Sequence, residues 1–234
     1  MSGGPAPGCS LCPRLVAFRA ANRAAHPEWW NDPVPSFGAL DAPLLIVGLA
    51  PGLRGANRTG RPFTGDYAGE LLYATLLRFG FAAGSYAARP DDLLVLLGCR
   101  VSNAVRCVPP ENRPTPAEAT ACRGFLAAEM AAMPALAAVL ALGVLAHQAV
   151  LRAWGLTASR VPFRHGAVHV LPDRPLLADS YHVSRYNTNT GRLTEAMFAA
   201  VMAGLAARLA VAGEAGPGRG AAVTRAPGAL SSAG

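Results

Sequence analysis

The chain has 234 residues, 52% of them hydrophobic, so it is long enough to fill one substantial core. Its 21 basic and 14 acidic residues give a formal net charge of +7, and every basic residue is Arg. An Arg surplus favours a polyanionic partner, because guanidinium groups match phosphate oxygens and stack on bases; GC-rich codons would produce the same bias. The first ten residues lack the features of a signal peptide, and the longest uncharged run, residues 130–151, is Ala-rich with an internal Pro and Gly. We therefore expect a cytoplasmic protein with no membrane span.

Four short apolar runs have the character of buried parallel strands, at residues 44–50, 93–104, 138–143 and 175–182. Helical patterns lie between and after them, at residues 66–81, 115–133 and about 193–209. The second of these opens with Thr-Pro-Ala-Glu, a capping-box pattern with Pro at the first helical position. Alternating strands and helices predict an α/β fold with a parallel sheet covered on both faces. Such sheets bind ligands at the carboxyl ends of their strands.

The end of the chain differs from the rest in composition. From Gly213 onward the sequence has no periodicity and is rich in Gly, Ala and Pro. We expect one domain over residues 1–212, acting as a monomer, and a disordered tail over residues 213–234.

The five cysteines divide into one core residue and two pairs. Cys99 lies inside an apolar strand and is typical of a buried core thiol. Cys9 and Cys12 form a C-x2-C pair where little core exists, and Cys107 and Cys122 flank a Pro-rich loop and a helix start. An odd count in a cytoplasmic chain argues against a disulfide framework. Four thiolates suit either tetrahedral zinc or an iron–sulfur cluster, and the wide separation of the second pair mildly favours the larger cluster.

Polar loops follow three of the predicted strands at one edge of the sheet. The loop at residues 48–66 holds five glycines, three arginines and one carboxylate, but neither a P-loop nor a dinucleotide-binding fingerprint. Its glycines let the backbone approach a flat ligand, and Phe63 offers a stacking face. The loop at residues 180–194 supplies His182 at a strand end and Tyr186 at its tip. These are the parts needed to receive a flipped nucleic-acid base.

Three segments together resemble the iron–sulfur uracil-DNA glycosylases of family 5 (type B). They are GLAPGLRGANRTGRPFTGD, SNAVRCVPPENRPTP and YHVSRYNTNTGRLTE, in matching order, and the resemblance covers residues 9 to about 202. It implies a three-layer α/β/α fold with a central four-stranded parallel sheet. It also implies removal of uracil and other deaminated bases, such as hypoxanthine, from double-stranded DNA in base excision repair. The implied cofactor is a [4Fe–4S] cluster on Cys9, Cys12, Cys107 and Cys122.

The chemistry of glycosidic cleavage gives roles to three residues within this resemblance. His182 donates to O2 of the leaving base as negative charge develops there. Asn103 presents its amide to the uracil edge or to a water molecule, and Asp66 stabilises the sugar cation or orients that water. Structural alternatives are a helix cap at Asp66, pairing of strand-end backbone groups by Asn103, and a buried structural role for His182. Val183 departs from the family, where Pro usually follows the histidine, but leaves His182 in place.

Base binding is expected along the first loop. Gly48 and Ala50 border the base and Phe63 stacks on it, with Asn103 at its edge; the alternative for Phe63 is a core residue. The family usually has a polar residue at the place that Leu49 and Ala50 occupy here. Because that residue is absent, Asp66 is expected to be more important for catalysis. The other four histidines show no clustered spacing and receive no role.

DNA contacts are expected at the mouth of the site. The candidates for phosphate contacts are Arg54, Arg58, Arg61 and Arg185, and the alternative for individual members is pairing with a carboxylate of the protein. Tyr186 is expected to fill the gap left by the flipped nucleotide.

Two other function classes are alternatives to a glycosylase. A non-catalytic binder of damaged bases or abasic sites would be favoured by loss of Asp66, Asn103 or His182, and all three are present. An iron–sulfur electron carrier or redox sensor leaves the polar loop at residues 48–66 unexplained. The sequence also has no lysine, so it lacks the side-chain amine with which strand-nicking glycosylases form a Schiff base.

Overall fold

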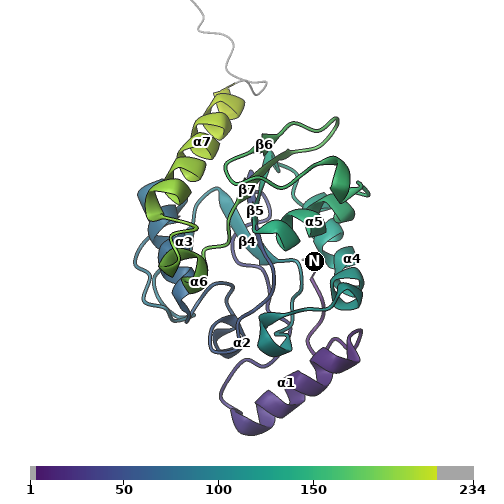
Figure 1. Ribbon diagram of the computed structural model, residues 1–234. Coiled ribbons are helices and arrows are strands. Elements are labelled where there is room, and N and C mark those ends of the chain that lie inside the picture. The colour runs from purple at the N-terminus through teal and green to yellow at the C-terminus, as the bar shows by residue number, and fades with distance from the viewer. Residues whose placement is uncertain (1–3, 215–234) are drawn as a thin grey trace, which may run out of the picture.

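The computed structural model describes residues 4–214 and has a five-stranded sheet at its centre (Figure 1). The strand order is β4, β1, β5, β7, β6, with the bounds Cys99–Asn103, Leu44–Gly48, Ala138–Leu142, Leu176–Ser180 and Val168–His169. The first four strands are parallel, so the predicted four-stranded parallel sheet is confirmed. The two-residue β6 pairs antiparallel with β7 and adds an edge that the sequence pattern did not predict.

Each face of the sheet is covered by its own pair of helices, because alternate strand residues point to opposite faces. Leu44 and Ile46 of β1 belong to the core under one pair, and Leu45 and Val47 to the core under the other. The first pair is α3 (Tyr67–Arg78) and α7 (Glu195–Glu214), and the second is α4 (Pro116–Ala131) and α5 (Val144–Ala153). The two pairs lie on opposite sides of the strands in Figure 1, which confirms the three-layer α/β/α fold.

Three of these four helices agree with the sequence prediction. The capping box of α4 is present, with Glu118 N donating to Thr115 Oγ1 at 3.3 Å and Thr115 N donating to Glu118 Oε2 at 2.7 Å. The sequence pattern did not predict α5, most of which lies in the uncharged run at residues 130–151. The last helix extends two residues into the predicted tail, and the rest of that tail lies outside the described residues. No helix of the described chain is both long and apolar enough to cross a membrane.

The run at residues 93–104 is not one strand, and that prediction was wrong. Its first half contains β3 (Val95–Leu96), which pairs antiparallel with β2 (Ala82–Ala83) in a separate two-stranded sheet. Gly98, with a φ of 62°, turns the chain before β4 begins. Leu93 is 76% exposed, so only the second half of the run belongs to the buried sheet.

An N-terminal arm carries α1 (Pro13–Ala25), which Figure 1 shows apart from the two helix layers, below the sheet. Two of its residues, Leu15 and Arg19, are buried. Arg14 of α1 makes two 2.7 Å hydrogen bonds to the carboxylate of Glu118 and so ties the arm to α4. The remaining short elements are α2 (Ala56–Thr59), α6 (Arg185–Asn189) and the 3-10 turns Pro110–Asn112 and Ala158–Arg160.

Candidate active site

The ends of β1 and β4 bring three of the predicted residues together. Gly48 and Asn103 are partners in the parallel register, and Asn103 is only 3% exposed. A Cβ atom on Gly48 would lie 2.5 Å from Asn103 Oδ1 and 2.5 Å from the ring of Phe63. Only glycine therefore lets both the amide and the ring approach the strand end so closely.

Phe63 and His182 form the next part of the site. Their ring centroids are 5.9 Å apart with an interplanar angle of 28°. Phe63 has a φ of 52°, a conformation rarely adopted by an aromatic residue and one that concentrates at functional sites. Asn187 Nδ2 donates to the carbonyl oxygen of His182 at 2.8 Å and fixes the loop. Burial lowers the pKa of His182 to about 4, so its ring is neutral at neutral pH and carries a single N–H donor.

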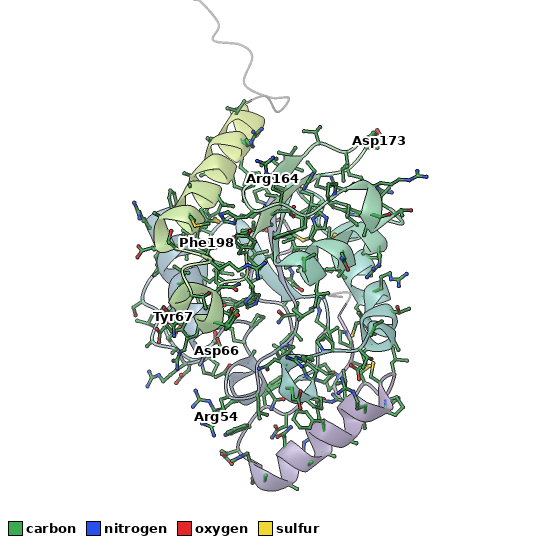
Figure 2. All side chains as sticks on the ribbon, in the orientation of Figure 1. Arg54, Asp66, Tyr67, Arg164, Asp173 and Phe198 are labelled. Atoms are coloured by element: carbon green, nitrogen blue, oxygen red, sulfur yellow. The ribbon has the colours of Figure 1, made fainter. Side chains whose placement is uncertain are left out.

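Asp66 lies at the far end of the same loop. One carboxylate oxygen, Oδ1, accepts from Ala68 N at 3.1 Å, which confirms the capping role at the start of α3. The other, Oδ2, lies 2.2 Å from where a Cβ on Gly55 would stand and 2.8 Å from that of Gly52. Burial raises the pKa of Asp66, against the hydrogen bonds from the backbone of Gly69 and Ala68. Capping thus uses one oxygen and leaves the other against the glycine-rich loop, and Figure 2 shows Asp66 beside α2.

Ala50 is the exception among the predicted base-binding residues. Its side chain packs on a small buried group formed by Leu15, Val105, Cys107 and Cys122. The methyl group therefore points toward the arm, and only the backbone of Ala50 remains to border a base. This packing also puts the first loop in direct contact with the cysteine region.

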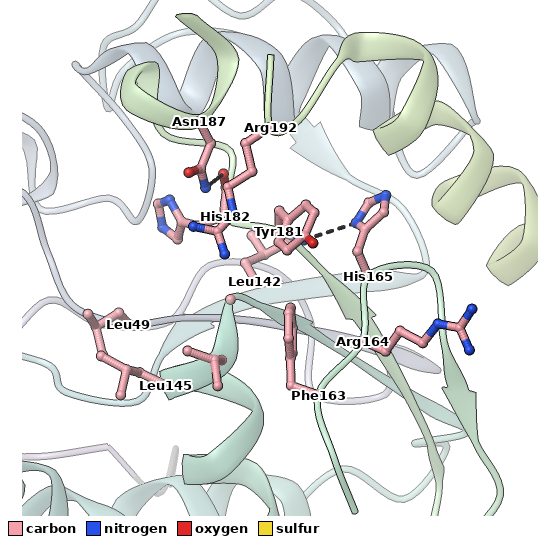
Figure 3. A pocket seen from close by; sticks show the side chains of 12 residues that line it. Leu49, Leu142, Leu145, Phe163, Arg164, His165, Tyr181, His182, Asn187 and Arg192 are labelled. Carbon is pink, nitrogen blue, oxygen red and sulfur yellow. Dashed lines mark hydrogen bonds between the residues drawn. The ribbon is translucent and has the colours of Figure 1, made fainter. Parts of the chain in front are cut away.

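A cavity of about 670 Å³ opens beside His182 (Figure 3). One wall is aromatic: the ring of His165 stacks on that of Tyr181 at 4.8 Å with an interplanar angle of 6°. Tyr181 N donates to His165 Nδ1 at 3.1 Å, and burial lowers the pKa of His165, which favours the neutral ring that can accept. The guanidinium of Arg192 lies 4.7 Å from the centre of the Tyr181 ring. No local sequence pattern marks this wall or gives His165 a role.

Behind that wall is a buried cluster that the sequence analysis also missed. Asp179, fully buried on β7, accepts from His147 Nδ1 at 2.7 Å and from His169 Nε2 at 2.8 Å. The other ring nitrogen of His147 lies 2.8 Å from the carbonyl oxygen of Val161. Although burial favours the neutral ring, the hydrogen bonds to Asp179 and Val161 raise the pKa of His147. The three side chains have the proximity of a metal site, but their ligand atoms already bond one another, so the cluster serves to anchor the cavity wall.

The four arginines predicted at the mouth of the site differ in environment. Arg54 is exposed, whereas the exposed Arg58 braces its loop by donating to Arg54 O at 2.9 Å. Arg61 is only 6% exposed and makes a bidentate ion pair with Asp92, at 2.7 and 2.8 Å, which holds the pKa of that carboxyl well below its usual range. The expected DNA contact at Arg61 is therefore wrong, because this guanidinium is already paired inside the protein.

The last predicted contacts come from α6. Arg185 is exposed, and its guanidinium lies 5.2 Å from the centre of the Tyr67 ring. Tyr186 is 72% exposed, a high value for a large aromatic side chain. Its position is that of a residue free to enter a base stack.

The four predicted ligand cysteines come together although they arrive from distant segments. Cys9, Cys12, Cys107 and Cys122 line one small cavity with Arg19, while Cys99 is buried elsewhere in β4. Burial raises the pKa of Cys107 to about 12, and the nearby Arg19 opposes that rise. Thiols so buried ionise readily only when a metal replaces the proton. Four thiol donors around one cavity have the chemistry of either a tetrahedral zinc site or an iron–sulfur cluster.

Comparisons with known proteins agree with this site. A family model described as the uracil DNA glycosylase superfamily matches residues 35–206, which include the edge loops but not the arm. The type-5 uracil-DNA glycosylase of Thermus thermophilus is 48% identical over 199 residues, covering 83% of this chain and 90% of that protein. That of Pyrobaculum aerophilum is 40% identical over 198 residues, covering 83% and 86%. A type-4 uracil-DNA glycosylase of Thermotoga maritima is 37% identical over 119 residues, covering only 50% and 54%.

Proposed function

The chain belongs to the uracil DNA glycosylase superfamily, and from this premise we propose that it is a monofunctional glycosylase that excises uracil from DNA in base excision repair. The observation that carries the proposal is that Asn103 and Phe63 meet at Gly48, while His182 stacks on Phe63. An aromatic face, an amide and a ring N–H donor placed in this way suit a flat group. A flipped pyrimidine has that shape and that hydrogen-bonding edge.

In this proposal the leaving base is stabilised by His182. As the glycosidic bond breaks, negative charge develops on uracil O2, and a fixed N–H donor in a water-poor site stabilises it. The low pKa of His182 means that a neutral ring performs this task. Asn103, buried in the strand end, reads the uracil edge through its amide.

Asp66 acts on the other side of the bond. Its carboxylate keeps one oxygen, Oδ2, against the glycine-rich loop while the other caps α3. A carboxylate in this position stabilises positive charge on the sugar or orients the attacking water. The cap holds the carboxylate in place, so the two roles are compatible.

Water is the nucleophile, because the chain has no lysine to form a Schiff base with the sugar. The product is then an intact abasic site and a free base. Hypoxanthine and other deaminated bases are further substrates in this proposal, and the cavity of about 670 Å³ beside His182 supports a tolerant site.

Double-stranded DNA binds through phosphate contacts and a wedge. Arg54, Arg58 and Arg185 are exposed around the loop at residues 48–66 and α6 and supply the contacts. Tyr186 fills the gap left by the flipped nucleotide, which its 72% exposure supports. The protein acts as a monomer.

The proposed cofactor is a [4Fe–4S] cluster held by Cys9, Cys12, Cys107 and Cys122. The common cavity and the thiol donor set support it. When bound, the cluster supplies a covalent cross-link between the arm and the body. Ala50 packs on the same region, so the cross-link also supports the first loop.

The test uses duplexes that each carry one uracil, hypoxanthine or xanthine, followed by alkaline cleavage of abasic sites. Gly48→Ala fills the space between Asn103 and Phe63 and should abolish uracil release. Gly124→Ala is the matched control, because a Cβ there meets nothing within 4 Å. Absence of alkali-labile strands with every duplex would overturn the proposal, and equal activity of both variants would remove Gly48 from the site.

A further inference from the structure

Arg19 is a buried cation whose hydrogen bonding is incomplete. Its side chain lies inside the molecule, with the residue only 3% exposed. One guanidinium nitrogen donates to Asp32 Oδ1 at 2.8 Å and another to the carbonyl oxygen of Cys9 at 2.5 Å. The remaining nitrogen, Nε, has no partner in the part of the chain that the structure describes. A buried N–H is seldom left unpaired in a native protein, so this donor points to a missing acceptor.

The surroundings of Arg19 limit what that acceptor can be. Arg19 lines the same small cavity as the four cysteines, together with Leu15 and two residues of the arm, Pro5 and Leu11. Arg106 also has an unpaired and buried Nε, but it bonds Glu129 and Ser36 and is not among the residues that line this cavity. Arg19, the residue that carries this unpaired donor, thus lines the cavity that all four proposed ligand cysteines share.

We propose that Arg19 is a positioning residue for the iron–sulfur cluster: its Nε–H donates to a sulfur of the cluster, and its charge offsets that of the four thiolates. This inference rests on the cluster in the proposed function. Its physical basis is that opposite charges interact strongly away from water, and that N–H donors to sulfur tune the potential of such clusters.

Arg19 also fixes the position of Cys9. By donating to the carbonyl oxygen of Cys9, it fixes the backbone of the first ligand. By donating to Asp32, whose Oδ1 also accepts from Gly8 N at 2.9 Å, it fixes the chain just before that ligand. One side chain therefore orders both the ligand segment and the electrostatic environment of the cluster.

The experiment compares Arg19→Gln, Arg19→Lys and Arg14→Gln in the full chain. Arg14→Gln is the matched control: it also removes a positive charge and an ion pair that docks the arm, but Arg14 has a side chain 43% exposed and pairs with Glu118. The readouts are iron and sulfide content, the reduction potential of the cluster, and hyperfine coupling to ¹⁵N in protein grown with arginine labelled only in its guanidinium group, because the backbone N–H of Arg106 also bonds to the thiol of Cys122.

We expect Arg19→Gln to shift the reduction potential to a more negative value and to speed cluster loss in air several-fold. Arg19→Lys, which keeps the charge, should restore most of the potential but lose the ¹⁵N coupling. Arg14→Gln should match the wild type in both measurements. If Arg19→Gln does not fold, the ¹⁵N coupling in the wild type and its loss in Arg19→Lys decide the question.

A wild-type cluster with no ¹⁵N coupling, or an unchanged coupling in Arg19→Lys, would overturn the inference while leaving the cluster itself in place. Equal potentials in Arg19→Gln and Arg14→Gln would overturn the electrostatic role. A purified chain without iron and sulfide would overturn the proposed cofactor, and the role of Arg19 with it.

Discussion

At the carboxyl edge of the sheet, the polar side chains stand next to buried strands, whereas residues 4–25 of the arm contribute only Leu15 and Arg19 to the buried interior. Asn103 and Gly48 keep their places because β1 and β4 are buried along their whole length. The arm has no such packing and is held by Arg14, Arg19 and the cysteine region. The site is therefore positioned by the core, and the arm depends on specific cross-links.

The largest expected effect lies at the edge. His182→Ala removes the donor to the leaving base and should lower the rate of uracil release by about 10²–10³-fold, because a lost oxyanion-type donor has this cost. Binding to abasic-site DNA should change little, since the ring does not hold the strands. Single-turnover assays on a uracil duplex measure the first effect. A rate within threefold or so of the wild type would mean that the edge is positioned for something other than leaving-group stabilisation.

In the arm, by contrast with the edge, we expect a substitution to cause a large loss of stability. Cys12→Ser removes one proposed ligand and should lower the melting temperature by more than about 5 °C, because a loss of 1 kcal/mol shifts a domain of this size by about 2–4 °C. Visible absorbance should be lost as well. Cys99→Ser is the matched control, since this thiol is buried in β4 and donates to Phe81 O at 3.2 Å, away from the other four. Full colour and unchanged melting in Cys12→Ser would remove Cys12 from the ligand set.

Two arginines of the first loop are expected to differ, because one is a proposed DNA contact and the other is packed inside the protein. Arg54→Gln should weaken DNA binding and lower the slope of log K against log[salt] by about 0.9, the value for one phosphate contact. Arg61→Gln should leave that slope unchanged and reduce stability, because it breaks the buried pair with Asp92. Binding titrations over a range of salt concentrations separate the two. A change of slope in Arg61→Gln alone would reverse the assignment.

The smallest expected effect is a loss of unfolding free energy at acid pH, which arises at His182 in the edge site. In the folded chain burial lowers the pKa of His182 to about 4, while its unfolded value is about 6.5. The unfolded state therefore binds the proton more readily, and the part of the stability linked to His182 is lost as pH falls from 6.5 toward 4. His182→Gln should show a smaller loss of unfolding free energy across that window in urea titrations. Identical pH profiles would mean that the ring is not desolvated.

The sequence predicted those parts of the molecule that depend on neighbouring residues. The four main strands lie within short apolar runs, and Asn103 and His182 lie near the carboxyl ends of such runs, in segments that resemble a known family. The cap at Asp66 and the capping box at Thr115 are also local patterns.

The failures share a different cause, because they depend on partners far away in the sequence. Arg61 is separated by 31 residues from the carboxylate that pairs with it, so its burial could not be read from the loop. Asp179 bonds His147 of α5 and His169 of β6, and no regular spacing in the sequence predicts that these residues are neighbours. The direction of the Ala50 methyl and the unpaired donor of Arg19 likewise appear only once the arm is packed.

In the proposed function, the edge site cleaves the glycosidic bond with water and without a protein amine. The measurement is incubation of a uracil duplex with the enzyme in the presence of borohydride, with free base, strand breaks and protein–DNA adducts followed together. We expect free uracil, an intact abasic strand that breaks only after alkali or heat, and no adduct, because the chain has no lysine. A borohydride-trapped covalent adduct would contradict it and would point to the N-terminal amine as the nucleophile.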